Sequence, residues 1–241
     1  MHRVSRLGLQ FLLSAIICGT LAARPAQGAG VTDWHAFAGT TRYHAADAAL
    51  PPPAPDRPRI VFLGDSITDA WPHASASPSP RREYINRGIS GQTTPQMLLR
   101  FRADVLDLKP AVVVILAGTN DIARNTGPTS PREIVGNIRS MALLARAEGI
   151  RVILCSLLPA ARYPWRPRID PRPAIAETNA MLRKLARQQH FGWVDYYKAL
   201  DDGHDGLPST LSTDGVHPNA AGYAKMNPLV DAAIGAALQR N

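Results

Sequence analysis

Short apolar runs recur along the chain from residue 59 onward, and longer segments with helical spacing separate them. Runs at 60–63, 84–86, 112–116, 151–157 and 193–196 predict five buried strands. Apolar residues follow one another in these runs and do not alternate strictly with polar ones, which is typical of parallel strands covered on both faces. We therefore expect a parallel sheet.

The segments between these runs carry helix start and stop signals. Ser130, Pro131 and Glu133 form a capping sequence, and the helix that they begin is expected to stop at Gly149. Further helices are predicted at 94–106, 174–189 and 220–238. Strands that alternate with helices imply right-handed βαβ crossovers, so the pattern predicts an α/β fold, a three-layer α/β/α sandwich.

The first 58 residues depart from this pattern. Residues 1–28 have a basic start, an apolar run and a small-x-small sequence at 26–28, which predicts a secretory signal peptide and a secreted or periplasmic protein. An uncleaved membrane anchor is the alternative, while Ile17 before Cys18 disfavours lipidation. Residues 29–58 are expected to form a loose helical lead-in and a proline-rich connector, and residues 59–241 the main domain.

Composition limits the classes of protein that fit. The 241 residues suit a single α/β domain, and 27 basic against 19 acidic side chains give a net charge of +8. Three of the basic residues are arginines within 1–28, so loss of that segment leaves 24 against 19, or +5. The arginine excess would suit a polyanionic partner, but no nucleic-acid-binding motif accompanies it. Cys155 is the only cysteine after residue 28, so we expect no intrachain disulfide and a buried thiol.

Polar motifs occupy four loops of the predicted sandwich. They lie at 64–69, 86–93, 118–121 and 214–219. In a parallel sheet, ligands bind at the loops that leave the carboxyl ends of the strands. A serine hydroxyl needs a histidine base that a carboxylate orients, and Ser66, His217 and Asp214 supply that set. The backbone N–H groups of Ser66 and Gly88 and the side-chain amide of Asn120 are expected to receive an oxyanion.

These four motifs, in this order, resemble those of the SGNH hydrolases, also called GDSL-type esterases and lipases. Ser66, Gly88, Asn120 and His217 stand at the four positions that name the family, and Ile67 stands where its eponymous motif has leucine. The resemblance covers 34–238 and is close to secreted bacterial members. It implies a flavodoxin-like sheet in a catalytic domain over 59–241, Ser66 as nucleophile, His217 as base with Asp214 as its partner, and Gly88 and Asn120 in the oxyanion hole. The implied mechanism requires no cofactor and no metal.

Several polar residues in these loops have structural alternatives. Ser66 would suit a helix cap and Asp214 a turn, if either were considered alone. Asp65, Asp69 and Asp121 are expected to hold loop backbone amides. The acidic segment 201–205 is expected to be a solvated turn, because it has no second histidine or cysteine at metal-ligand spacing.

Two aromatic positions also have a structural and a functional interpretation. Trp71 is either a wall of the substrate pocket or a packing anchor. The segment 163–173 either carries Trp165 and Arg166 toward the substrate or forms a proline-stiffened surface connection.

The sequence thus predicts a secreted serine esterase whose partner is a small-molecule or glycan ester. Short acyl groups, such as acetyl on a carbohydrate, are favoured because no long apolar lid accompanies the motifs. The alternatives are a lysophospholipid or other lipid ester, and a non-catalytic module that binds glycans or polyanions. We expect no nucleic-acid partner and no stable membrane insertion once the signal is cleaved.

Overall fold

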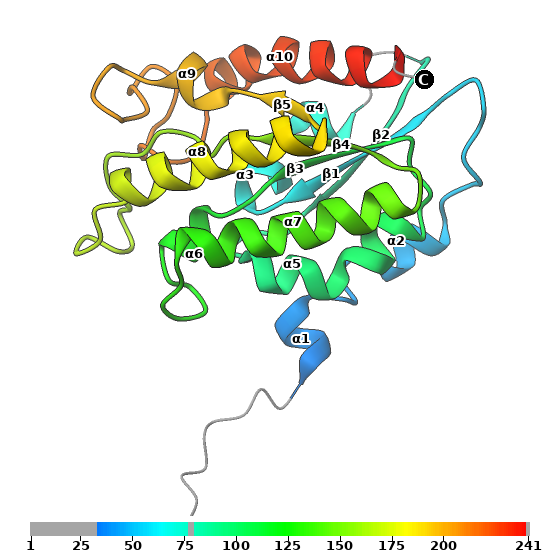
Figure 1. The fold of residues 1–241 in the computed structure, drawn as a ribbon, viewed down its shortest axis with the longest axis horizontal. Helices are drawn as coiled ribbons and strands as arrows, with labels where there is room; N and C mark the ends of the chain where they lie inside the picture. The colour runs from blue at the N-terminus through cyan, green and yellow to red at the C-terminus, as the bar shows by residue number, and fades with distance from the viewer. Residues whose placement is uncertain (1–32, 77–79, 240–241) are drawn as a thin grey trace, which may run out of the picture. The chain divides into compact units, whose positions relative to one another are not determined.

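The computed structural model describes residues 33–76 and 80–239 (Figure 1). The predicted signal peptide over 1–28 lies outside these residues. From Asp33 onward the chain forms one compact unit, so the segment before the first strand belongs with the rest of the domain. None of the helices in the described ranges is long and apolar enough to cross a membrane.

Five parallel strands form the central sheet. They are β1 (Arg59–Gly64), β2 (Glu83–Gly88), β3 (Val112–Leu116), β4 (Arg151–Cys155) and β5 (Gly192–Val194). Their order across the sheet is β2-β1-β3-β4-β5, and every neighbouring pair is parallel. This is the flavodoxin-like order, and it confirms the predicted parallel sheet.

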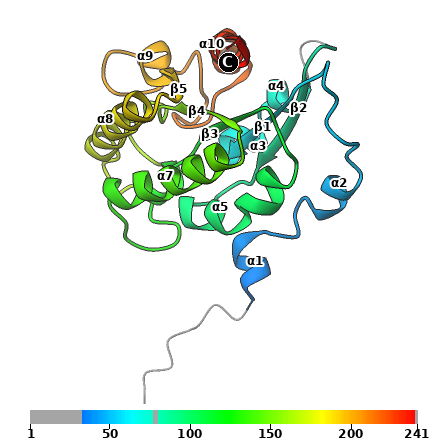
Figure 2. The ribbon, with the colours of Figure 1, turned by 45° about the vertical axis from the view of Figure 1, so that its right-hand side comes forward.

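Two apolar layers cover the two faces of the sheet. Successive side chains of a strand point to opposite faces, so Val61 and Leu63 pack into one layer and Ile60 and Phe62 into the other. The first layer packs against α5 (Thr94–Phe101), α7 (Pro131–Ala147) and α8 (Arg172–Gln189), and the second against α10 (Ala220–Gln239). Figures 1 and 2 show α5, α7 and α8 together on one side of the sheet and α10 on the other. The predicted three-layer sandwich is confirmed.

Capping explains where the long helices begin and end. Ser130 and Glu133 form the expected capping box at the start of α7, and Gly149 follows the helix with a φ of 75°. The helix predicted at 94–106 is instead α5 followed by a π-helical turn, η1 (Arg102–Leu106). The predicted strand at 193–196 ends at Val194, because the Asp195 side chain accepts the N–H of Lys198 and begins α9 (Tyr196–Leu200).

The loose helical lead-in expected before β1 is two short helices, α1 (Trp34–Ala38) and α2 (His44–Ala48). Gly39 ends α1 in the left-handed region, at a φ of 66°. Both helices are attached to the main domain: Gln92 donates its side-chain amide to the carbonyl of Ala38, and Arg87 pairs with Asp47. This attachment places the segment beside the loop that follows β2.

Candidate active site

The site lies at the carboxyl edge of the sheet, where three strands end together. Gly64, the last residue of β1, pairs in register with Gly88 on β2 and with Leu116 on β3. The chain passes from β1 to β2 on one side and to β3 on the other, so the order of the strands reverses here. Loops that leave neighbouring strands at such a point diverge and form a crevice. Ser66 follows β1 at this position.

Ser66, His217 and Asp214 form a continuous chain of hydrogen bonds. Ser66 Oγ lies 2.9 Å from His217 Nε2, and His217 Nδ1 lies 2.6 Å from Asp214 Oδ2. The second carboxylate oxygen, Oδ1, accepts the backbone N–H groups of Val216 (2.9 Å) and His217 (2.8 Å). The acid is therefore fixed by its own loop, and it orients the imidazole toward the serine.

The environment of Asp214 keeps its carboxyl group ionised. Partial burial alone would raise its pKa, but the hydrogen bonds from the His217 side chain and from two backbone N–H groups outweigh burial and lower the pKa to about 2. The side chains of Asp214 and His217 remain 37% and 38% exposed. The site is thus open to water, with a charged acceptor held against Nδ1.

A turn fixes the position of Ser66 directly after the strand. Asp65 is the N-cap of the short helix α3 (Ser66–Asp69), and its Oδ1 accepts the N–H of Ile67 at 3.0 Å. The cap is therefore Asp65, and Ser66 is the first residue of the helix. Burial raises the pKa of Asp65 to about 6, although the Ile67 N–H opposes this shift.

A protein-family model matches residues 62–225, and it describes the GDSL-like lipase/acylhydrolase family. This match spans all four motifs and most of the sheet. The chain belongs to this family. Membership supports the enzyme class expected from the motifs, a carboxylic ester hydrolase.

Individual relatives agree with the GDSL-like assignment. The crystal structure of a GDSL-like lipase from Bacteroides thetaiotaomicron is 43% identical, with a TM-score of 0.79 over 83% of this chain and 99% of that one. Esterase TesA of Pseudomonas aeruginosa is 32% identical over 59% of this chain, and the match spans 64% of its own length, just under two thirds. An acetylxylan esterase of Geobacillus stearothermophilus is 26% identical over 68% of this chain and 88% of its own.

Asn120, expected in the oxyanion hole, lies beside the loop that follows β2. It sits on the short helix α6 (Thr119–Ile122) after β3, and its Nδ2 donates to the carbonyl of Gln92 at 3.1 Å. Asn125 donates to both Asn120 Oδ1 and the carbonyl of Gly91. One hydrogen of the Asn120 amide is therefore used, and the second remains for a ligand.

Gly88 has a packing role in the structure. Its N–H already donates to Asn86 Oδ1 at 2.8 Å, and a Cβ at this position would lie 2.1 Å from the backbone nitrogen of Asp69. Glycine is thus required for close approach of β2 to α3, and its N–H is not available for an oxyanion as the structure stands. The sequence alone does not reveal either contact.

Gly91, in the same motif, differs from Gly88 in two ways: its surroundings are open, and its backbone N–H has no partner among the described residues. It has a φ of 80°, and nothing lies within 4 Å of the position where a Cβ would stand. None of the hydrogen bonds among residues 33–76 and 80–239 uses its N–H. Through Asn125 it is one hydrogen-bonded side chain away from Asn120. The sequence signal that could have identified Gly91 was a second glycine in the 86–93 motif, three residues after Gly88.

The acidic residues that were expected to hold loop amides do so. Asp69 accepts the N–H and the hydroxyl of Ser90, and both oxygens of Asp121 accept the N–H of Thr94. In the 201–205 segment, Asp202 Oδ1 accepts the N–H of His204 at 2.8 Å. Each carboxylate holds a loop in shape around the site or at the surface.

Trp71 and Trp165, each of which had two interpretations, lie in different environments. Trp71 is 1% exposed and packs among Phe62, Tyr196 and Tyr223, so it is a packing anchor. Trp165 is 38% exposed, and its ring centroid lies 6.0 Å from that of His217. The segment 163–173 therefore brings an aromatic side chain to the catalytic histidine candidate, which the sequence left undecided.

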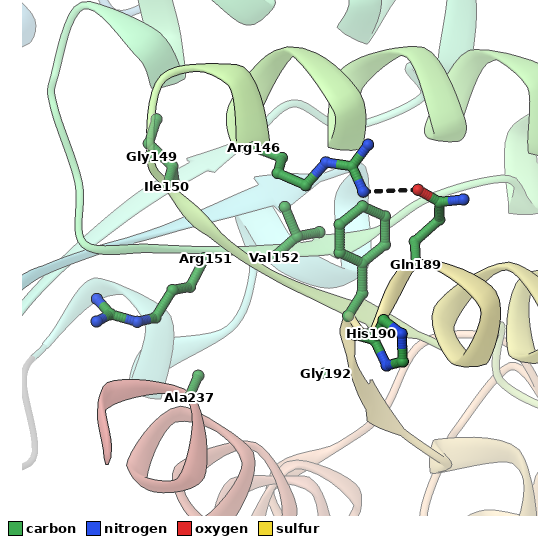
Figure 3. A pocket seen from close by; sticks show the side chains of 10 residues that line it. Arg146, Gly149, Ile150, Arg151, Val152, Gln189, His190, Gly192 and Ala237 are labelled. Carbon is green, nitrogen blue, oxygen red and sulfur yellow. Dashed lines mark hydrogen bonds between the residues drawn. The ribbon is translucent and has the colours of Figure 1, made fainter. Parts of the chain in front are cut away.

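Another pocket lies at the opposite, amino edge of the sheet, where β4 and β5 begin. It is lined by Arg146, Arg151, Gln189 and His190, among others, and Figure 3 shows Arg146 extended toward Gln189. Arg146 Nη1 donates to Gln189 Oε1 at 2.6 Å. Ser66 and His217 are not part of this pocket, so its cationic side chains are separate from the GDSL-like motifs.

Proposed function

We propose that this chain is a secreted or periplasmic esterase that removes short acyl groups, such as acetyl, from a carbohydrate by a Ser-His-Asp acyl-enzyme mechanism. The hydrogen-bond chain Ser66–His217–Asp214 at the carboxyl edge carries this proposal. Secretion rests on residues 1–28 alone, and an anchor formed by an uncleaved signal is the alternative.

His217 takes part in two proton transfers in each half of the reaction. His217 Nε2 takes the proton of Ser66 Oγ as the oxygen attacks the ester carbonyl carbon, and the carbonyl oxygen becomes negatively charged. The carbonyl then re-forms, the bond to the alcohol oxygen breaks, and His217 returns the proton to that oxygen. Water repeats the sequence on the acyl-serine and releases the acid. Asp214 stabilises the imidazolium that forms in each half of the cycle.

We assign the oxyanion donors to Ser66 N–H, Asn120 Nδ2 and Gly91 N–H, with Gly91 in place of Gly88. Ser66 N–H lies in the first turn of α3, where backbone N–H groups have no partner within the helix. The free N–H of Gly91 and the second hydrogen of the Asn120 amide support the other two assignments. Donors fixed before the reaction stabilise the developing charge at no reorganisation cost.

The carbohydrate substrate is supported by relatives and by the shape of the site. The acetylxylan esterase of Geobacillus stearothermophilus matches over 88% of its own length. The open triad, with His217 38% exposed, suits an ester carried on a bulky hydrophilic molecule. The family description also includes lipases, so hydrolysis of a lipid ester is the alternative.

Replacement of the nucleophile tests the proposal. Ser66→Ala should lower kcat on 4-nitrophenyl acetate by about 10⁴-fold or more, since the serine acts as a unit with its base. Ser140→Ala is a matched control, because its hydroxyl only bonds the carbonyl of Gly136 on the surface of α7. A fluorophosphonate should add to the wild-type protein and not to Ser66→Ala, as read by intact mass. Retention of ester hydrolysis by Ser66→Ala would exclude this mechanism, and sugar binding without turnover would favour a non-catalytic module.

A further inference from the structure

Trp165 lies on a turn that is fixed at both ends. The N–H of Arg166 donates to the carbonyl of Tyr163 at 2.9 Å, and Pro164 supplies the φ angle that the second position of such a turn prefers. Tyr163 is fully buried, and Arg166 Nε donates to the carbonyl of Ala123 at 3.0 Å. The tryptophan is therefore held in position before a substrate arrives.

The indole ring of Trp165 lies between a buried ring and the base of the triad. It stacks on Tyr163 with a centroid distance of 5.2 Å and an interplanar angle of 18°. It lies 6.0 Å from the imidazole of His217, at an interplanar angle of 33°. Since 38% of Trp165 remains exposed, the ring offers apolar surface to a ligand beside His217.

The chemistry of the triad determines which part of an ester passes this surface. The acyl group becomes bonded to Ser66 Oγ, whereas the alcohol oxygen must take a proton from His217 Nε2 as its bond to carbon breaks. The leaving alcohol therefore departs within hydrogen-bond reach of His217. Trp165, the aromatic neighbour of His217, is placed on the path of that alcohol.

We propose that Trp165 is a specificity-determining residue that binds the leaving alcohol, and that this alcohol is a sugar ring. The inference rests on the proposed esterase function. A pyranose has a face of C–H groups that is apolar and slightly positive, which matches the negative face of an indole ring. Its hydroxyl groups keep their contact with water at an open site.

A lipid chain fits this surface less well, because it needs continuous apolar area. The exposed large hydrophobic side chains among the described residues are Trp34, Leu99, Leu144, Trp165 and Leu229. Of these, only Trp165 has a ring contact with a triad residue. A single flat ring suits one sugar unit.

Esters that share an acetyl group and differ in the alcohol test this inference. Trp165→Ala should lower kcat/KM by about 10-fold on an acetylated methyl pyranoside, mainly through KM, and by less than about twofold on ethyl acetate. Trp165→Phe retains a flat ring and should keep most of the activity on the pyranoside. Trp34→Ala, which removes an exposed tryptophan from α1, is the matched control and should leave both rates unchanged.

Two kinetic results would overturn the inference. Equal losses on both acetyl esters would mean that Trp165 only supports His217. A loss that grows along ethyl acetate, ethyl butyrate and ethyl hexanoate would place the acyl chain, and not the alcohol, against the ring.

A binding measurement separates this inference from the proposed function. Saturation-transfer NMR should detect the methyl pyranoside without acetyl on Ser66→Ala, and the signal should disappear when Trp165→Ala is added. That result would support the inference even if the wild-type protein hydrolysed no ester. Absence of binding to both proteins, or equal binding to both, would overturn it.

Discussion

The two edges of the sheet carry similar residue types in different arrangements. At the carboxyl edge, His217 joins a serine hydroxyl to a carboxylate through its two ring nitrogens. At the amino edge, His190 ends α8 with its backbone in the left-handed region, at a φ of 57°, and Arg146 bonds the amide of Gln189 (Figure 3). His217 links a hydroxyl to a carboxylate, as the proposed mechanism requires, and the backbone of His190 closes a helix.

The two edges also differ in which ends of the helices they meet. At the carboxyl edge, α3 begins at Ser66 and α6 at Thr119, and the first N–H groups of a helix have no internal partner. At the amino edge, α7 ends at Ala147 and α8 at Gln189, and helix C-termini favour cations. Donors at one edge suit an oxyanion, while arginines at the other stabilise helix ends.

Loss of the Asp214 carboxylate should produce the largest effect. Asp214→Asn places an amide N–H against His217 Nδ1 and favours the tautomer whose Nε2 cannot accept the serine proton, so kcat should fall by about 10⁴-fold. The low pKa of Asp214, about 2, means that its stabilising contribution is present above pH 4 and is lost only as pH falls through 2. Any loss of wild-type activity between pH 7 and 5 should therefore not come from protonation of Asp214. Steady-state kinetics with Asp170→Asn, an exposed surface acid, is the control.

Removal of an oxyanion donor should have the second largest effect. Asn120→Ala and the nearly isosteric Asn120→Asp both lose the side-chain N–H, and each should lower kcat by about 10²- to 10³-fold with little change in KM. Asn125→Ala removes the hydrogen bonds to Asn120 Oδ1 and to the Gly91 carbonyl but keeps the Asn120 side-chain N–H, so it should cost less than about tenfold. Equal losses for Asn120 and Asn125 variants would argue that the loop matters and the donor does not.

The sequence predicted the sheet better than the details of the site. Continuous apolar runs placed all five strands, because burial on both faces requires such runs in a parallel sheet. The ends of strands were less predictable: β5 stops where the Asp195 side chain captures a backbone N–H, a contact that apolar patterns do not record.

Individual site residues depended on contacts between distant segments. Ser66, His217 and Asp214 were recognisable from motifs, and the structure brings them together. Gly88 and Gly91 lie in one motif, but their surroundings differ. Gly88 packs against the backbone of Asp69, and Gly91 does not. Trp165 is far in sequence from His217, so its place in the site required the fold.

The pH dependence of the free energy of unfolding tests whether Asp65, at the carboxyl edge, is buried. Its pKa of about 6 exceeds the usual 3.8, so the folded protein holds this proton more tightly than the unfolded chain does. The free energy of unfolding should therefore fall as pH rises from 4 to above 6, by about 3 kcal/mol from this group. Asp65→Asn keeps the acceptor for Ile67 N–H and should lack that fall. Urea titrations of both proteins between pH 4 and 7.5 measure the difference, and a constant difference would contradict a buried, raised Asp65.

The smallest effect is expected at the amino edge. Arg146 is exposed, its guanidinium lies 5.7 Å from the Phe191 ring centroid, and it donates to Gln189. Arg146→Ala should lower the free energy of unfolding by about 0.5–1 kcal/mol and leave kcat/KM on 4-nitrophenyl acetate within about twofold of wild type. Arg139→Ala, an exposed arginine earlier on α7, is the matched control and should change neither quantity. A large fall in kcat/KM for Arg146→Ala alone would show that the amino edge takes part in catalysis, and the contrast between the two edges would no longer hold.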